Sequence, residues 1–114
     1  MRSERGSGTV LAVALIGCLM AVTLAVVPLY RVLAIRQAVA GAADAAALAA
    51  ADVAAGYAAG YPCEMAEHVA SANNSRLDSC TVDGLIATVT TAREFAGFSV
   101  TSTATAGPPP GEAD

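Results

Sequence analysis

Large side chains are scarce in this chain of 114 residues. It contains no tryptophan, aromatic residues make up only 4%, and charged residues make up 14%, against about 25% in an average soluble domain. Alanine supplies much of the 55% hydrophobic content, and a buried alanine removes little apolar area from water. A self-sufficient globular core is therefore not expected, and the chain should depend on a membrane, a covalent cross-link or partners.

Lysine is absent, and the two parts of the chain differ in charge. Residues 1–36 hold four arginines and one acidic residue, whereas residues 37–114 hold two arginines and nine acidic residues, for a formal net charge of -4. An acidic C-terminal part without a basic patch argues against binding of nucleic acid.

The residue combinations that carry catalysis are also missing. The sequence contains no nucleophile beside a base, no paired carboxylates in a motif and no glycine-rich phosphate loop. The single histidine, His68, lies between two cysteines, but known zinc sites use close cysteine pairs that this chain lacks. We therefore expect no enzyme, no cofactor, no metal site and no small-molecule substrate.

One long apolar run is present near the N-terminus. No charged residue occurs from Gly6 to Tyr30. Its central part, residues 9–30, would cover about 33 Å as a helix at about 1.5 Å per residue, enough to cross the hydrocarbon layer. Tyr30 and Arg31 follow at the position where interface anchors are expected. The run predicts a transmembrane helix.

A cleaved signal peptide is the main alternative, because Ala38-Val39-Ala40 resembles a small-residue cleavage site. The apolar run is longer than the 7–15 residues of a signal-peptide core, and the candidate site lies beyond Arg31 and Arg36. An uncleaved anchor is therefore favoured, and a small secreted protein released near Ala40 is the competing hypothesis.

The orientation of the span depends on weaker signals. The arginines on its two sides nearly balance. We place residues 1–8 in the cytoplasm, because such a short head has no evident role outside and because the two distant cysteines suit an oxidising compartment. The sequence thus predicts a single-pass protein of the cell membrane with an extracytoplasmic C-terminal module.

Two patterns along the predicted helix suggest association. Gly17, Ala21 and Ala25 form a row of small residues that would let helices approach closely in lipid, although alanine and glycine are common throughout this chain. Residues 31–59 should continue as an alanine-rich helical stalk, ended by Gly56, Gly60 and Pro62. Apolar positions with heptad spacing follow it: Val32, Ile35, Val39, Ala42, Ala46, Ala49 and Val53. This seam fits either another long helix or the chain's own module.

The two later cysteines should be joined. Cys63 and Cys80 form an even pair in an apparently exported segment, whereas Cys18 lies in the apolar run and should serve packing. A disulfide closing this loop would stabilise the module by about 3 kcal/mol on the chain-entropy model.

The module itself, residues 61–106, is expected to combine helix and strand. Residues 64–72 have a helical pattern, and Asn73-Asn74 suits a left-handed helix stop. Residues 85–90 and 98–105 are rich in β-branched side chains, and residues 98–105 alternate apolar and hydroxyl side chains. The two segments predict a hairpin, joined by a polar connection. A short strand near Cys80 would extend the sheet. The fold class is therefore α+β, followed by an irregular tail, residues 107–114.

Several of these residues together resemble a known family. The head Arg5-Gly-Ser-Gly-Thr9 before the apolar helix, Arg36-Gln37, and the run GAADAAALAAADVA from Gly41 to Ala54 resemble the TadE/TadG-like pilus-assembly family. The second half is similar to its short actinobacterial helicase/secretion-neighbourhood branch. The matching positions there are Pro62, Cys63, Ala66, Val69, Ala70, Asn73, Leu77, Cys80, Val82 and Gly84.

The resemblance implies a pilin-like fold and a non-enzymatic pseudopilin-like component of a tight-adherence (Flp-type) pilus or secretion system. Its partners would be other pilin-like subunits and a secretion platform with its ATPase. Prepilin peptidases cut after a glycine, so Gly6 and Gly8 are candidate processing positions. The glutamate that many pilins carry five residues later is absent, since Leu11 and Val13 stand there. A permanent assembly factor, or a stand-alone anchored binding module, are the alternatives.

Overall fold

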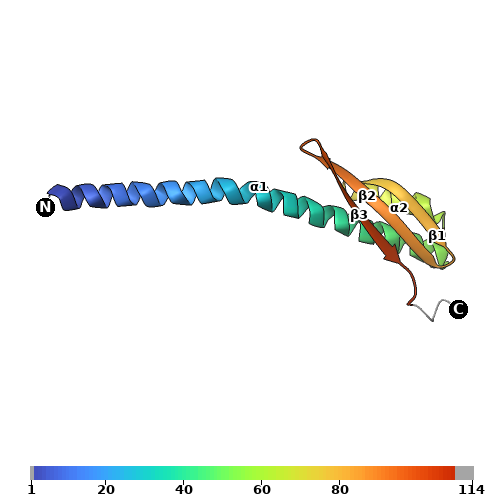
Figure 1. Ribbon diagram of the computed structural model, residues 1–114. Coiled ribbons are helices and arrows are strands. Elements are labelled where there is room, and N and C mark those ends of the chain that lie inside the picture. Colours follow the sequence, from blue (N-terminus) through green and yellow to red (C-terminus); the bar gives the residue numbers. More distant parts are fainter. Residues whose placement is uncertain (1, 110–114) are drawn as a thin grey trace. The chain divides into compact units, whose positions relative to one another are not determined.

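The computed structural model describes residues 2–109, with side chains from residue 6 onward. It confirms the α+β fold class: a long helix α1 (Arg2–Ala54), a short helix α2 (Pro62–Ala72) and three strands, β1 (Arg76–Asp83), β2 (Ile86–Phe95) and β3 (Phe98–Ala106) (Figure 1). The chain divides into two compact units, residues 1–33 and residues 34–114. The second unit contains the C-terminal part of α1 and the whole module.

Helix α1 begins at Arg2, before the predicted span at residue 9, and ends at Ala54, before the end of the predicted stalk at residue 59. It includes Pro28 without interruption and stops at Ala54, where Gly56 adopts φ +87°. The Gly56 N–H donates to the Val53 carbonyl at 3.1 Å and the Tyr57 N–H to the Asp52 carbonyl at 2.9 Å. This paired bonding is the Schellman motif that glycine permits. Gly56 therefore ends the helix as predicted, and residues 55–59 of the predicted stalk lie beyond it.

Helix α2 follows its predicted course. Pro62 occupies its first turn, where a missing N–H costs nothing. At its end Asn74 adopts φ +58°, while the Ser75 N–H donates to the Ala70 carbonyl at 2.9 Å. The prediction of a left-handed stop at Asn73-Asn74 is therefore confirmed.

The sheet has the order β1-β2-β3, and both pairs are antiparallel (Figure 1). The expected hairpin is present, but residues 91–95 extend β2 instead of forming a polar connection. A two-residue turn explains the difference: Ala96 and Gly97 have φ values of +52° and +84° and lie between the paired residues Phe95 and Phe98. Positive φ at both central positions is typical of a type I′ turn, which continues both strands to its edge.

The core of the second unit consists mostly of alanine. One face of α1, α2 and the inner face of the sheet form a buried cluster in which every residue but Val89 is alanine: Ala43, Ala46, Ala47, Ala50, Ala51, Ala66, Ala70, Ala87 and Val89. Larger side chains are only partly buried around it, among them Leu77 and Val82. Such small side chains let helix and sheet backbones approach closely, but each contributes little buried area.

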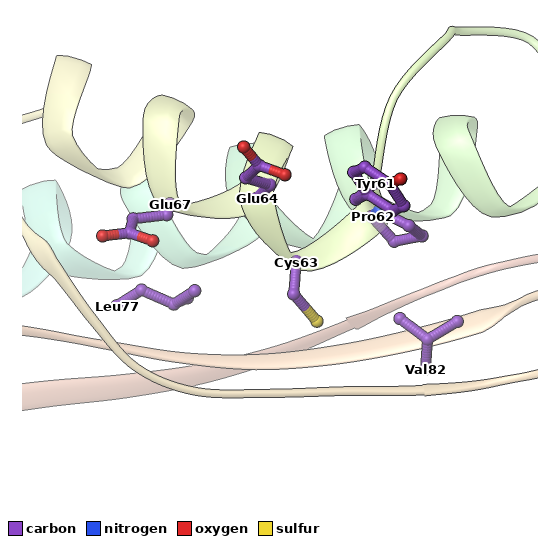
Figure 2. Close-up of a pocket in the computed structure, with 7 residues that line it drawn as sticks. All are labelled: Tyr61, Pro62, Cys63, Glu64, Glu67, Leu77 and Val82. Carbon is purple, nitrogen blue, oxygen red and sulfur yellow. The ribbon is translucent and has the colours of Figure 1, made fainter.

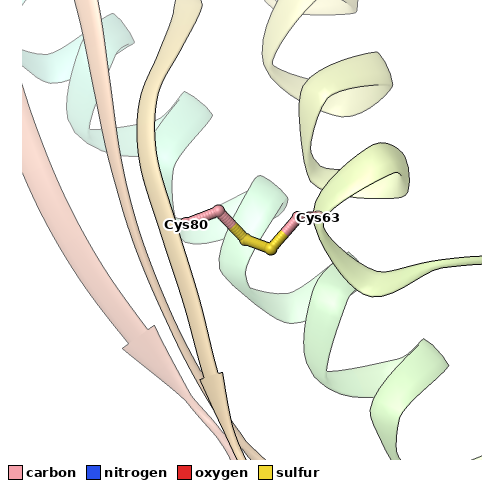
Figure 3. The surroundings of a disulfide bond; sticks show 2 residues. All are labelled: Cys63 and Cys80. Carbon is pink, nitrogen blue, oxygen red and sulfur yellow. A yellow bond between two sulfur atoms is a disulfide. The ribbon is translucent and has the colours of Figure 1, made fainter.

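One disulfide bond and one buried hydrogen bond connect the elements of this unit. Cys63 of α2 and Cys80 of β1 form a disulfide with their Cα atoms 5.8 Å apart (Figure 3), which confirms the predicted pair. The buried Thr91 hydroxyl of β2 donates to the Val39 carbonyl of α1 at 3.0 Å. Both links join residues that are far apart in the sequence.

Candidate functional site

The N-terminal part of α1 exposes a continuous apolar surface. The large apolar side chains between Val10 and Leu29 are 45 to 73% exposed, and none of the most apolar window of the helix is buried. Helix α1 therefore has one stretch long and apolar enough to span a membrane.

The predicted row of small residues lies within this apolar stretch. Gly17, Ala21 and Ala25 are all exposed on α1, and a Cβ added at Gly17 would meet no atom within 4 Å. Val32 is 36% exposed. All four positions are thus accessible to another helix, and association through them stays a prediction.

Two other predicted association residues are not accessible. Val39 and Ala46 are 0% exposed, because the sheet and α2 cover this face of α1. The prediction that these two positions pack against a second long helix was wrong for that reason. The heptad spacing instead marks the face that packs against the chain's own module, the other partner that the sequence allowed.

The candidate cleavage sites lie within the same helix. Gly6 and Gly8 are exposed near the start of α1. Ala38-Val39-Ala40, the signal-peptide alternative, falls in the middle of α1, where Val39 is buried and its carbonyl accepts the Thr91 hydroxyl bond. Cleavage after Ala40 would remove Val39 from the core, so the structure argues against release at that point.

The residues with metal-ligating or redox chemistry are dispersed or already joined. Within the described part of the chain, no group of three or more His, Cys, Asp or Glu side chains is placed to hold a metal ion. His68 is exposed on α2. Cys18 is a free, exposed cysteine of the apolar stretch, and its packing role stays a prediction.

A groove runs between α2 and β1, and we call it the α2–β1 groove (Figure 2). It has a volume of about 470 Å³, is open to solvent and is lined by Tyr61, Pro62, Cys63, Glu64, Glu67, Leu77 and Val82. Figure 2 shows Leu77 and Val82 on the strand side, and Glu64 and Glu67 on the helix side. Its floor is apolar and its rim carries two carboxylates and one phenol.

The outer face of the sheet carries hydroxyl side chains in register. Thr88 and Thr105 are paired across β2 and β3, as are Thr90 and Thr103, and their hydroxyl oxygens lie 3.1 and 2.8 Å apart. These pairs satisfy one another and stabilise the strand pairing.

An ion-pair network closes one end of this outer face. The Arg76 guanidinium of β1 donates to Glu94 at 2.7 Å, to Asp78 at 2.8 Å and to the Ser99 hydroxyl at 3.2 Å. The hydrogen bonds to Glu94 and then Asp78 raise the pKa of Arg76 above its ordinary value. Arg76 therefore joins all three strands from the solvent side.

The groove, the hydroxyl pairs and the Arg76 network were not among the features predicted from the sequence. Strand β1 has the sequence RLDSCTVD, in which apolar and polar residues do not alternate regularly. The structure has a register shift between Leu77 and Ser79, so the full length of the strand could not be predicted from alternation. The one available signal was the apolar pair Leu77 and Val82 on either side of Cys80.

No protein-family model matches the chain, and no curated protein or solved structure is significantly similar to it.

Proposed function

We propose that this protein is a non-enzymatic, membrane-anchored, pseudopilin-like component of a tight-adherence (Flp-type) pilus assembly or secretion system. One observation carries the proposal: α1 contains both an exposed apolar stretch and, further along, a face buried in the core of a small α+β module. A single helix thus serves as anchor and as core element, the design that the pilin-like resemblance implies.

The proposed topology is a single pass through the cell membrane, with the N-terminus cytoplasmic and the module outside. The Cys63–Cys80 disulfide supports this orientation, because disulfides persist in oxidising compartments and are rare in the cytoplasm. In this role the module is presented to neighbouring pilin-like or TadE/TadG-like subunits and to the secretion platform with its ATPase.

The buried stalk seam changes how such subunits would associate. Since Val39 and Ala46 belong to the chain's own core, contacts between helices fall to the membrane part, at Gly17, Ala21, Ala25 and Val32. Cysteines introduced at Ala21 and Val32 should form disulfide cross-links to a second subunit in membranes. A cysteine at Val39 is the matched control and should give none.

The first experiment is the mass and N-terminal sequence of the membrane-bound chain from an actinobacterial host carrying a tight-adherence gene cluster. A start at Ser7 or Thr9 would show prepilin-type processing at Gly6 or Gly8 and support a filament subunit. An intact N-terminus would support a permanent assembly factor. A start near Gly41 would contradict the membrane-anchored role.

Deletion of the gene in the same host tests the system itself. Loss of surface pili or of secretion, restored by the wild-type chain, is expected. Normal pili and secretion in the deletion strain would sink the assembly role and leave the stand-alone anchored binding module. The α2–β1 groove is the specific feature that favours this second candidate.

A further inference from the structure

We propose that the α2–β1 groove binds an extended, arginine-bearing segment of a partner protein. The groove lies on the module, and its lining combines an apolar floor with an acidic rim and an exposed aromatic ring. Each of these three features matches one part of an arginine side chain.

The rim supplies negative charge that the chain does not neutralise itself. Glu64 and Glu67 are exposed on α2, one helical turn apart. Among residues 6–109, the ion pairs of the structure all belong to Arg76, whose partners are Asp78 and Glu94. The two carboxylates of the rim are therefore left to water or to a cation from outside.

The surroundings favour a cationic partner over an anionic one. Residues 37–114 hold nine acidic residues against two arginines, and Arg76 is already engaged. The field at the groove is thus negative, which attracts cationic segments and repels acidic proteins and nucleic acids.

The floor suits the stem of a long basic side chain. Pro62, Leu77 and Val82 line the same groove as the two carboxylates, and Figure 2 shows Leu77 next to Glu67. Arginine and lysine bury their methylene stems along apolar surfaces while the charged head stays in water. An uncharged apolar segment would cover the floor but leave the carboxylates without a cation.

Tyr61 selects arginine over lysine. Tyr61 is 75% exposed and lines the groove, where Figure 2 shows it beside Pro62. A guanidinium group stacks on an aromatic face and donates to carboxylates in a planar fork, which an ammonium group does not do.

The open form of the groove fits an extended chain better than a small molecule. Sites for small molecules enclose most of the ligand surface, whereas this groove is open to solvent along its length. In the proposed function the partner would be an assembly subunit, and to that extent the inference rests on that function. The binding experiment uses only this chain and a peptide, so its failure leaves the assembly role untouched.

The test uses the full chain in detergent micelles and a labelled, end-blocked peptide, Gly-Val-Arg-Val-Arg-Val-Gly. Fluorescence anisotropy measures its affinity, and amide chemical shifts report where it binds. Saturable binding with shifts at Tyr61, Glu67, Leu77 and Val82 is expected. The same peptide with citrulline for both arginines keeps the shape, loses the charge, and should bind at least about five-fold more weakly.

Two double variants separate a site from general attraction. Glu64→Gln with Glu67→Gln should weaken binding by about five-fold or more. Asp44→Asn with Asp52→Asn removes the same charge from exposed positions on α1 and should leave binding within about two-fold. Equal losses in both variants, shifts away from the groove, or the same shifts appearing with chain concentration alone, which would place a second copy there, would each overturn the proposal.

Discussion

At the scale of the residue, alanine decides how α1 meets the sheet. Ala43, Ala46 and Ala47 are 0% exposed and belong to the buried cluster that α1 forms with α2 and the sheet. Alanine loses no side-chain entropy on burial, so ordering a core of this kind costs little conformational entropy beyond that of the backbone. Such a core also tolerates little extra volume, because close-packed interiors have few voids.

Ala46→Leu should therefore destabilise the module by about 1–3 kcal/mol through overpacking. Thermal unfolding in detergent, followed by circular dichroism of the sheet signal, measures the effect. Ala38→Leu, at an exposed position of the same helix, is the control and should change stability by less than about 0.5 kcal/mol. Equal Tm values for the two variants would contradict the buried position of Ala46.

Thr91 is the residue that fixes the sheet to α1 through a buried hydrogen bond. Thr91→Val keeps the shape but removes the donor to the Val39 carbonyl, and should cost about 1 kcal/mol. The Val39 carbonyl keeps its helical partner, so the loss should not be larger. Chemical denaturation measures it, with the exposed Thr101→Val as the near-neutral control; a stabilised Thr91→Val chain would refute the role.

At the scale of the element, the disulfide stabilises the packing of α2 on β1, and the Ala96-Gly97 turn stabilises the pairing of β2 with β3. The small side chains of the alanine core contribute little to either. Cys63 and Cys80 are separated by 17 positions and connect α2 to β1 across the groove. Turn Ala96-Gly97 sets the register of β2 and β3, since Phe95 pairs with Phe98 directly beside it.

Reduction of the disulfide should lower stability by about 3 kcal/mol, which for a module of this size corresponds to a Tm decrease of roughly 12–24 °C. The comparison is made in a Cys18→Ser background, so that the free cysteine cannot exchange. Cys18→Ser alone should leave the oxidised Tm unchanged. A reduced form that melts with the oxidised one would show that packing alone stabilises the module.

The turn offers a stabilising change. Ala96 has φ +52°, a conformation in which a Cβ costs about 1–2 kcal/mol. Asparagine tolerates it and is preferred before glycine in type I′ turns. Ala96→Asn should raise stability by about 0.5–1 kcal/mol, whereas Gly97→Ala, at φ +84°, should lower it. Urea midpoints of the two variants shifting in the same direction would contradict the turn type.

At the scale of the whole molecule, one helix carries two different surfaces. Its N-terminal part exposes large apolar side chains, and its C-terminal part buries alanines. Leu19 and Leu48 are both exposed leucines of this helix, at 68% and 59%. Only Leu19 belongs to the uncharged run. The two positions therefore allow a test of whether the uncharged run, and not the later part of α1, is the proposed membrane span.

Leu19→Arg should weaken membrane integration, since arginine near the centre of a span costs about 2.5–3.5 kcal/mol on insertion scales. Leu48→Arg should have no such effect. The measured quantity is the fraction of chain extracted from membranes by alkaline carbonate. Full retention of Leu19→Arg, or release of both variants alike, would place the membrane-spanning stretch elsewhere.

The sequence by itself determined the features that depend on local chemistry. The uncharged run predicted the apolar stretch of α1, and Asn73-Asn74 predicted the end of α2. The even pair Cys63 and Cys80 predicted the disulfide. In each case the physical cause lies within a few residues or in a simple count, so that no knowledge of distant contacts was needed.

Only the tertiary structure decided what covers the alanine face of α1 and where β2 ends. A face of small apolar residues fits a second helix and a sheet equally well, so burial of Val39 and Ala46 could not be assigned from spacing. The length of β2 depended on pairing with β1 and β3 and on positive φ at Ala96, which alanine rarely adopts. The α2–β1 groove likewise joins residues of two elements that only folding brings together.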